Sequence, residues 1–322
     1  MHLLGGVIVN SANSIMHRPL LVVVVLQLLC VSMYAISIGD MMERDYTVYD
    51  PLPIILGDAT AQGWYPVQEN KTCIEGLGIP FVQVTKSEDE KKRPITLYFT
   101  PGGQVTGIGV AVSGAQKANL VTKGYFIPLE DTVATDAYPN AKDLFYMSVT
   151  FRESGSVCAS TVDASLPLGD RLVLNAASPQ RATLEALPVT ASDASAAGWM
   201  KGSCFSGMGT HYFKDLTQNG TLSWESANMV PISLMFDEES EDATGNINAF
   251  FFTATTVQQS IFPPSANEWE PVPLTGGLMC KNLCADDCKW QDTEFFSTLH
   301  IYLNTKRPNV TCHDKCTISC CK

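Results

Sequence analysis

Two segments of this chain, 135 residues apart, carry nearly the same sequence. LPIILGDATAQGW (52–64) aligns without a gap on LPVTASDASAAGW (187–199), and seven of the thirteen positions are identical. Three further pairs of blocks follow in the same order: CIEGLGIPF (73–81) with CFSGMGTHY (204–212), PITLYF (94–99) with PISLMF (231–236), and MSVTF (147–151) with LHIYL (299–303). Blocks repeated in a fixed order indicate one duplicated module. We therefore expect both copies to fold in the same way.

The apolar stretches of each copy are short and rich in β-branched and aromatic residues, which is typical of strands. ITLYF (95–99) and VTGIGVAVS (105–113) flank a glycine-rich turn, and this pattern predicts an antiparallel hairpin. ISLMF (232–236) and INAFFFTATTV (247–257) repeat the pattern across an acidic loop. The sequence predicts a mostly β protein of two duplicated modules, sandwich- or barrel-like, with a disulfide-rich C-terminal element.

The N-terminus predicts export. Residues 18–35 form an apolar run after a single arginine and end near small residues, as secretory signal peptides do. We expect a cleaved signal peptide at 1–35, with Met16 as a possible true start, and an uncleaved signal anchor is the alternative. The predicted domains are a first β module at 36–161, a connector at 162–186 and a second β module at 187–322. LGDRLVLN (168–175), within the connector, is compatible with a strand.

Composition narrows the choice of partners. The formal net charge is −12, and loss of Arg18 with the signal leaves 20 basic against 33 acidic residues, or −13. A chain this acidic, without a basic stripe, is a poor binder of nucleic acid. After signal cleavage no segment approaches the roughly 20 apolar residues of a spanning helix. We therefore expect a secreted protein with an unknown extracellular ligand or protein partner, no nucleic-acid partner and no membrane span.

Cysteines and sequons agree with export. Removal of the signal leaves an even set of ten cysteines, which in an oxidising compartment indicates up to five disulfides. They are Cys73, Cys158, Cys204, Cys280, Cys284, Cys288, Cys312, Cys316, Cys320 and Cys321. Three N-x-S/T sequons, at Asn70, Asn219 and Asn309, predict glycosylation.

The duplication also predicts pairings. The first copy contains only Cys73 and Cys158, so these two are expected to form a disulfide. Their counterparts are Cys204 and Cys312, although a near neighbour in the crowded tail is an alternative partner for Cys204. The other six cysteines are expected to crosslink the C-terminal element. A zinc site among them, with His313 nearby, is a competing interpretation, but oxidation would consume the thiolates first.

Two histidines of the second copy lie inside repeated blocks. His211 stands where the first copy has Pro80, and His300 stands where it has Ser148. If a site exists, we expect it in the second module, around Met208, His211, Tyr212 and His300. The two histidines, with a carboxylate such as Asp193 or Asp215, are candidate ligands of zinc or copper or acid–base catalysts. The simpler hypothesis is that each histidine is a packed strand residue with a satisfied hydrogen bond.

Two repeated aspartates have a structural interpretation. Asp58 and Asp193 occur in both copies, although only one copy has the histidines. We therefore interpret them as caps of short helical turns.

The GMGTHY segment and the strand that follows it resemble a group of uncharacterised exported proteins with an M-G-x-H-Y motif. The matching residues are Met208, Gly209, His211, Tyr212, Pro231 and Leu234. The resemblance implies no activity and draws attention to His211. The sequence as a whole predicts an extracellular binding or structural glycoprotein without a cofactor rather than an enzyme. A metal-binding protein or metal-dependent enzyme that uses His211 and His300 is the alternative.

Overall fold

The structure is a computed structural model that divides into two compact units, residues 1–36 and 37–322. The residues described below all belong to the second unit. They are 38–39, 41–45, 50–84, 92–113, 127–128, 144–159, 165–175, 184–218, 223–225, 229–240, 244–254, 269–273, 289–290, 295–305 and 309–312. The predicted signal peptide lies outside them. Within these segments, the helices lack the length and the apolar character of a membrane-spanning helix.

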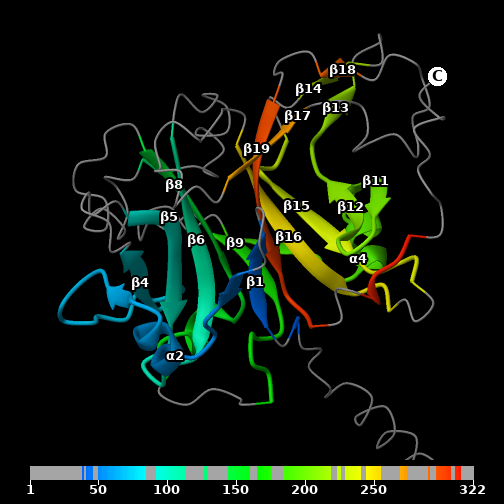
Figure 1. Ribbon diagram of the computed structural model, residues 1–322. Coiled ribbons are helices and arrows are strands. Elements are labelled where there is room, and N and C mark those ends of the chain that lie inside the picture. Colours follow the sequence, from blue (N-terminus) through cyan, green and yellow to red (C-terminus); the bar gives the residue numbers. More distant parts are fainter. Residues whose placement is uncertain are drawn as a thin grey trace, which may run out of the picture. The chain divides into compact units, whose positions relative to one another are not determined.

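The first sheet is antiparallel and runs in the order β10-β9-β8-β6-β5-β4-β3, with β7 paired to β8 (cyan to green in Figure 1). Its strands are β3 (Trp64–Pro66), β4 (Ile79–Val84), β5 (Lys92–Phe99), β6 (Val105–Ser113), β7 (Ile127–Pro128), β8 (Leu144–Thr150), β9 (Leu172–Asn175) and β10 (Leu184–Leu187). β5 and β6 form the hairpin predicted from the glycine-rich turn.

The second sheet is also antiparallel and runs in the order β11-β12-β15-β16-β19-β1-β2, with β17 paired to β19. Its strands are β1 (Met42–Asp45), β2 (Asp50–Leu52), β11 (Met200–Phe205), β12 (Gly209–Phe213), β15 (Ile232–Phe236), β16 (Ile247–Ala254), β17 (Glu270–Pro273) and β19 (Phe295–Tyr302). A small third sheet contains β13 (Thr217–Gln218), β14 (Ser223–Glu225) and β18 (Lys289–Trp290).

Helical structure in the described residues is limited to two short α-helices and one 3₁₀ turn, at Ser154–Ser156. The helices are α2 (Leu56–Ala61) and α4 (Ala191–Ala196), and each precedes the first strand of its block. The mostly β prediction, with two antiparallel modules, is confirmed. The described part of the C-terminal region contributes one cysteine to a disulfide.

The two sheets share one topology. The first block contains α2, then β3, β4, β5 and β6, then the short β7 and the long β8. The second contains α4, then β11, β12, β15 and β16, then the short β17 and the long β19. A two-stranded hairpin then completes each sheet. The hairpins are exchanged: β1–β2 precedes the first block but pairs with β19, whereas β9–β10 precedes the second block but pairs with β8. β9–β10 directly follows its partner β8 in the sequence, whereas β1–β2 and its partner β19 lie near opposite ends of the described chain.

Backbone hydrogen bonds repeat at matching positions. The Leu56 amide donates to Gly103 and the Ala191 amide donates to Gly245, at 2.7 and 2.8 Å. Gly78 and Gly209 both have positive φ, at 111° and 105°. A Cβ atom on either would press against a backbone carbonyl, that of Phe99 or Phe236. The same glycine requirement thus recurs in both blocks because the same turn does.

Side chains from both sheets meet in one large hydrophobic cluster. It contains Leu97, Ile108 and Val149 of the first sheet together with Leu234 and Ile301 of the second. The rings of Phe151 and Phe250 contact each other at 6.5 Å between centroids. Trp64 and Trp199, the two tryptophans of the repeated LP…GW block, are both buried.

Two expectations need correction. The segment 162–186 is more than a connector, because β9 and most of β10 lie in it and extend the first sheet. Residues 42–45 and 50–52, before the repeated blocks, form β1 and β2 of the second sheet. Strands of three or four residues are too short to show an alternating pattern in the sequence.

The predicted helix caps were also wrong. The N-cap of α4 is Thr190, whose hydroxyl accepts from the Asp193 amide, and the N-cap of α2 is Ile55 without a side-chain bond. Asp58 and Asp193 lie in the first helical turn. There a carboxylate is favoured by the helix dipole rather than by capping.

Candidate functional site

His211 lies on β12, where it is buried in an aromatic environment. It is 1% exposed, and its ring contacts Phe205, Phe213 and Phe251 at centroid distances of 5.0, 6.4 and 5.7 Å. Nδ1 lies 3.1 Å from the Gly209 carbonyl, which only accepts, so the imidazole donates this bond. Burial lowers the pKa of His211 to about 4, against the opposing effect of backbone bonds to Gly209 and Ser203. His211 is therefore neutral at physiological pH.

His300 lies on β19 and is 5% exposed. Its ring contacts Phe251 at 4.8 Å and stacks on Tyr302 at 6.3 Å. Its Nδ1 lies 3.6 Å from a carboxylate oxygen of Glu270, which β17 brings alongside β19. Burial, and then repulsion from His211, lower the pKa of His300 to about 3. The Glu270 carboxylate is 41% exposed, so water screens its opposing effect.

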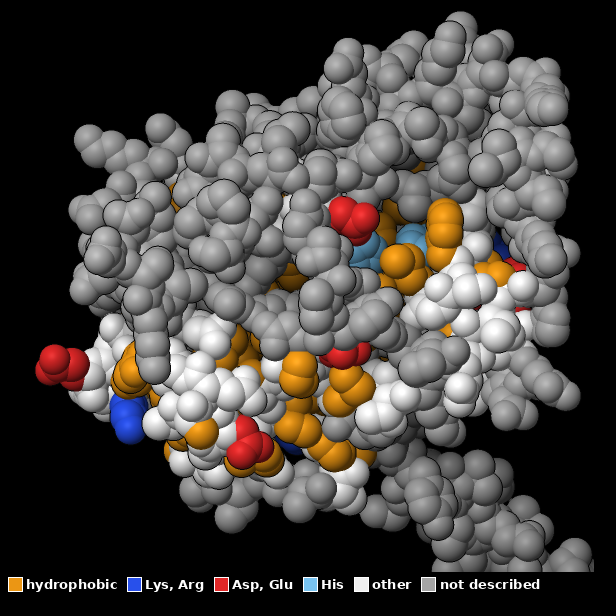
Figure 2. Space-filling view, in the orientation of Figure 1, with side chains coloured by type: hydrophobic (Ala, Val, Ile, Leu, Met, Phe, Trp, Pro, Cys, Tyr) orange, Lys and Arg blue, Asp and Glu red, His pale blue; other side chains and the backbone are white. Residues whose placement is uncertain are grey.

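The structure brings the two histidines to one face of the second sheet, with Phe251 between them. Their strands are separated by β15 and β16, and Phe251 on β16 contacts both imidazoles. Histidine side chains are visible beside hydrophobic ones in Figure 2. Phe213, Phe251 and Tyr302, which contact these histidines, belong to a small hydrophobic cluster that also contains Leu216, Met229, Met235 and Ala249. Met208 packs against this cluster and is partly buried.

Tyr212 belongs to a different environment from His211. Consecutive strand residues point to opposite faces, and Tyr212 packs in the large cluster with its ring 5.1 Å from Phe236. Its hydroxyl donates to the Glu238 carboxylate at 3.2 Å, and Lys201 forms an ion pair with Glu238 at 3.1 Å. Burial and the Glu238 charge raise the pKa of Tyr212. The hydroxyl therefore acts as a donor and not as a base.

Three hydroxyls near His300 are buried without a hydrogen-bond partner among the described residues: those of Ser233, Thr253 and Thr298. Each of these residues is at most 2% exposed. Ser233, Phe251 and His300 lie opposite one another across three strands, and Thr253, Thr298 and Glu270 form the next row. Directly paired residues share a face of the sheet. No sequence pattern indicates this group, because serine and threonine are ordinary strand residues.

The equivalent face of the first sheet is chemically different. Tyr146 pairs with β7 as Thr298 pairs with β17. The hydroxyls of Tyr98 and Tyr146 lie 2.8 Å apart in a buried hydrogen bond. Burial raises the pKa of Tyr146 well above its usual value. On this face of the first sheet the hydroxyls of Tyr98 and Tyr146 satisfy each other, whereas the second sheet presents histidines beside hydroxyls without a partner among the described residues.

Both disulfides predicted from the repeat are present. Cys73 bonds Cys158 and Cys204 bonds Cys312, each with a Cα–Cα distance of 5.8 Å. Asn70 and Asn309 are exposed, as a glycan requires. Three predictions concern residues outside the described ones: the crosslinks of the C-terminal element by Cys280, Cys284, Cys288, Cys316, Cys320 and Cys321, the His313 alternative and the Asn219 sequon.

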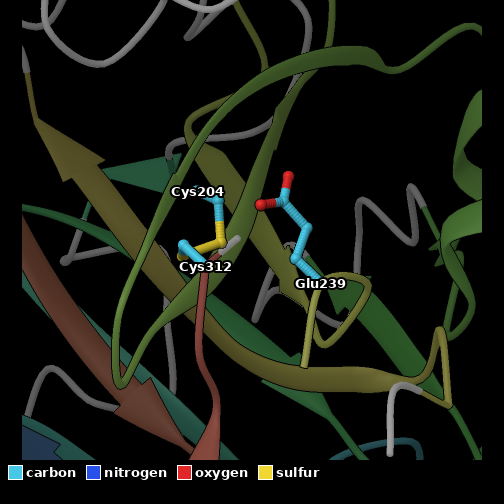
Figure 3. A group of neighbouring side chains, drawn as sticks. All are labelled: Cys204, Glu239 and Cys312. Carbon is cyan, nitrogen blue, oxygen red and sulfur yellow. A yellow bond between two sulfur atoms is a disulfide. The ribbon is translucent and has the colours of Figure 1, made fainter. Parts of the chain in front are cut away.

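One group of three potential metal ligands occurs among the described residues. Cys204, Cys312 and Glu239 each offer one ligand atom, and these atoms lie within 4.8 Å of one another. Figure 3 shows the Glu239 carboxylate beside the Cys204–Cys312 disulfide. Sulfurs joined in a disulfide are not thiolates, so this group does not bind a metal in the oxidised protein.

No family model, no curated protein and no solved structure matches this chain.

Proposed function

We propose that this chain is a secreted, glycosylated protein of two duplicated β modules that acts by binding an extracellular ligand or partner. A structural role outside the cell belongs to the same proposal, and catalysis does not. The observation that carries it is the pair of disulfides, one at the same place in each block. Disulfides persist in oxidising compartments and are rare in the cytosol.

The chemistry of the histidines supports binding over catalysis. A general acid or base works best with a pKa near the operating pH. Burial instead places the pKa values of His211 and His300 at about 4 and about 3. Both imidazoles are therefore fixed in the neutral form, which donates and accepts hydrogen bonds without exchanging protons.

We place binding on the second sheet, beside His300. Leaving a buried hydroxyl unsatisfied costs about 1–3 kcal/mol, so Ser233, Thr253 and Thr298 together favour any group that supplies hydrogen bonds there. A small hydroxylated ligand or ordered water has the matching donors and acceptors. Glu270, 41% exposed, connects this buried row to solvent.

Metal binding is the second candidate, and Glu270 is the observation that favours it. A metal ligand set needs a carboxylate beside the imidazole, and Glu270 lies 3.6 Å from His300 Nδ1. Zinc bonds to nitrogen and oxygen are each about 2.0–2.2 Å, so one ion spans such a gap. Phe251 lies between His211 and His300. The ligands of zinc or copper would therefore be His300 and Glu270 rather than His211.

The test is expression of the full chain in a secreting eukaryotic cell. We expect the protein in the medium, a mass decrease after removal of N-glycans, and Cys73–Cys158 and Cys204–Cys312 peptides in a non-reducing map. Protein that stays in the cytosol with free thiols would contradict the proposal. Metal analysis of the same sample separates the candidates: equimolar zinc or copper that is lost in both His300→Gln and Glu270→Gln would establish the second.

A further inference from the structure

The group formed by Cys204, Cys312 and Glu239 joins three separate parts of the chain. Cys204 lies on β11, Glu239 lies on the acidic loop between β15 and β16, and Cys312 follows β19. Their ligand atoms are mutually within 4.8 Å, and the two Cα atoms of the cysteines are 5.8 Å apart. In Figure 3 the carboxylate points toward the sulfur atoms.

We propose that this group is a redox-gated site for a divalent metal ion of the zinc class. In the oxidised protein the disulfide keeps the site closed. A dithiol reductant transfers two electrons to the S–S bond, which breaks to give two thiols while the reductant becomes a disulfide. Zinc then replaces the two thiol protons, and the ion is bound by two thiolates and the Glu239 carboxylate.

The ligand chemistry fits zinc. Thiolate sulfur and carboxylate oxygen are both zinc ligands, with bonds of about 2.3 Å and 2.0–2.2 Å. Two thiolates and one carboxylate carry three negative charges, so the occupied site would have a net charge near −1. Cys204 is buried, whereas Cys312 and Glu239 are partly exposed. The fourth position would therefore face solvent and take a water molecule.

The third ligand is a property of the second module alone. β5 and β6 are joined by residues 100–104, whereas β15 and β16 are joined by the longer segment 237–246, which contains Glu239. Among the described residues, no such metal group includes Cys73 or Cys158. The two disulfides occupy the same place in their blocks, so the first one is a built-in control for the second.

Metal binding would preserve a connection that reduction otherwise removes. The disulfide ties β11 to the segment after β19, across 108 residues of sequence. A metal bound by both cysteines keeps these segments together without the covalent bond. The reduced second module would thus remain closed in the presence of zinc, whereas the reduced first module would not.

The experiment uses the full chain, reduced without oxygen by a phosphine reductant, and cobalt(II) as a spectroscopic substitute for zinc. We compare it with Glu239→Gln, which leaves every cysteine in place, so that binding by other thiols appears equally in both proteins. Glu75→Gln, an exposed acid next to the first disulfide region, controls for the loss of charge. Thermal unfolding with and without zinc is the second readout.

We expect the reduced protein to show thiolate-to-cobalt absorption and a rise in Tm with zinc. Glu239→Gln should weaken metal affinity at least about tenfold. Loss of a residue that only hydrogen-bonds a metal ligand already has an effect of about this size. Glu75→Gln should leave it unchanged. Equal affinities in the reduced protein and Glu239→Gln would overturn the proposal and leave adventitious thiol binding only. Metal bound equally before reduction would overturn the gating.

Discussion

The phenol of Tyr146 lies in the space that a Cβ atom on Gly109 would need. The second sheet reverses these sizes, since Phe251 and Thr298 occupy the matching positions on β16 and β19. In the first sheet the large side chain of Tyr146 covers Gly109. In the second sheet the smaller side chain of Thr298 lies beside Phe251. The same backbone is thereby filled in two ways, and only the second brings histidine rings against the inserted aromatic side chain.

Replacement of Gly109 by alanine should destabilise the protein. The added methyl group meets the Tyr146 hydroxyl and ring, which are fully buried and cannot move into solvent. Overpacking of this kind costs about 1–3 kcal/mol. Urea unfolding measures the loss. Gly57→Ala is the control, because nothing lies within 4 Å of its Cβ position in α2, and it should be neutral or stabilising by up to about 1 kcal/mol.

The buried bond between Tyr98 and Tyr146 should appear as an interaction energy. Removing either hydroxyl, by Tyr98→Phe or Tyr146→Phe, should cost about 1–3 kcal/mol because the remaining hydroxyl loses a partner 2.8 Å away. The double variant should cost less than the sum of the two single variants. A double-mutant cycle from denaturant unfolding gives this energy. Strict additivity would show that the two hydroxyls do not support each other.

Stability should fall in mild acid because of the buried histidines. The pKa values of His211 and His300 are lowered from 6.5 to about 4 and about 3, so the unfolded chain takes up protons first. Each histidine therefore removes stability as pH falls from about 6.5 toward its folded pKa, by about 1.4 kcal/mol per pH unit. Unfolding at pH 7.0, 5.5 and 4.5 should show a shallower decline for His300→Gln. Parallel declines would contradict the assigned burial.

Loss of either disulfide should cost nearly the same. The bonded cysteines are 85 and 108 residues apart, and loop-closure entropy changes slowly with length. For loops near 100 residues the entropic model gives about 4.7 kcal/mol. Cys73→Ser/Cys158→Ser and Cys204→Ser/Cys312→Ser should therefore lower the unfolding free energy equally, as measured in urea. A large difference between them would point to structure that survives in one reduced module.

Much of this fold is predictable because the same sequence pattern occurs twice in the chain. The positions of Cys204 and Cys312 relative to Cys73 and Cys158 identified both disulfides, and the β-branched runs identified β5, β6, β15 and β16. The hairpin exchange escaped prediction because pairing partners are set by tertiary contacts. β1 is a four-residue strand, and its partner β19 lies near the other end of the described chain.

The site was predictable only in part. Comparison of the copies singled out His211 and His300, and their register on β12 and β19 places both on one face. Glu270 could not be found because it comes from β17, a short strand outside the repeated blocks. Tyr212 was grouped with His211 by sequence adjacency, yet neighbouring strand residues point to opposite faces.

The pairing of β1 with β19 makes the second sheet depend on the N-terminal part of the chain. A fragment that stops after residue 161 would keep β1 and β2 but would lack β9 and β10, so its own sheet would end at an open β8 edge. The complementary fragment would lack the strands that close β19. A first half extended to residue 187 would keep all strands of its sheet, β3 to β10, but the second half would still lack β1 and β2. Destabilising substitutions confined to residues 42–52 should therefore lower the stability of the sheet formed by residues 200–302, and unfolding should proceed as one cooperative event.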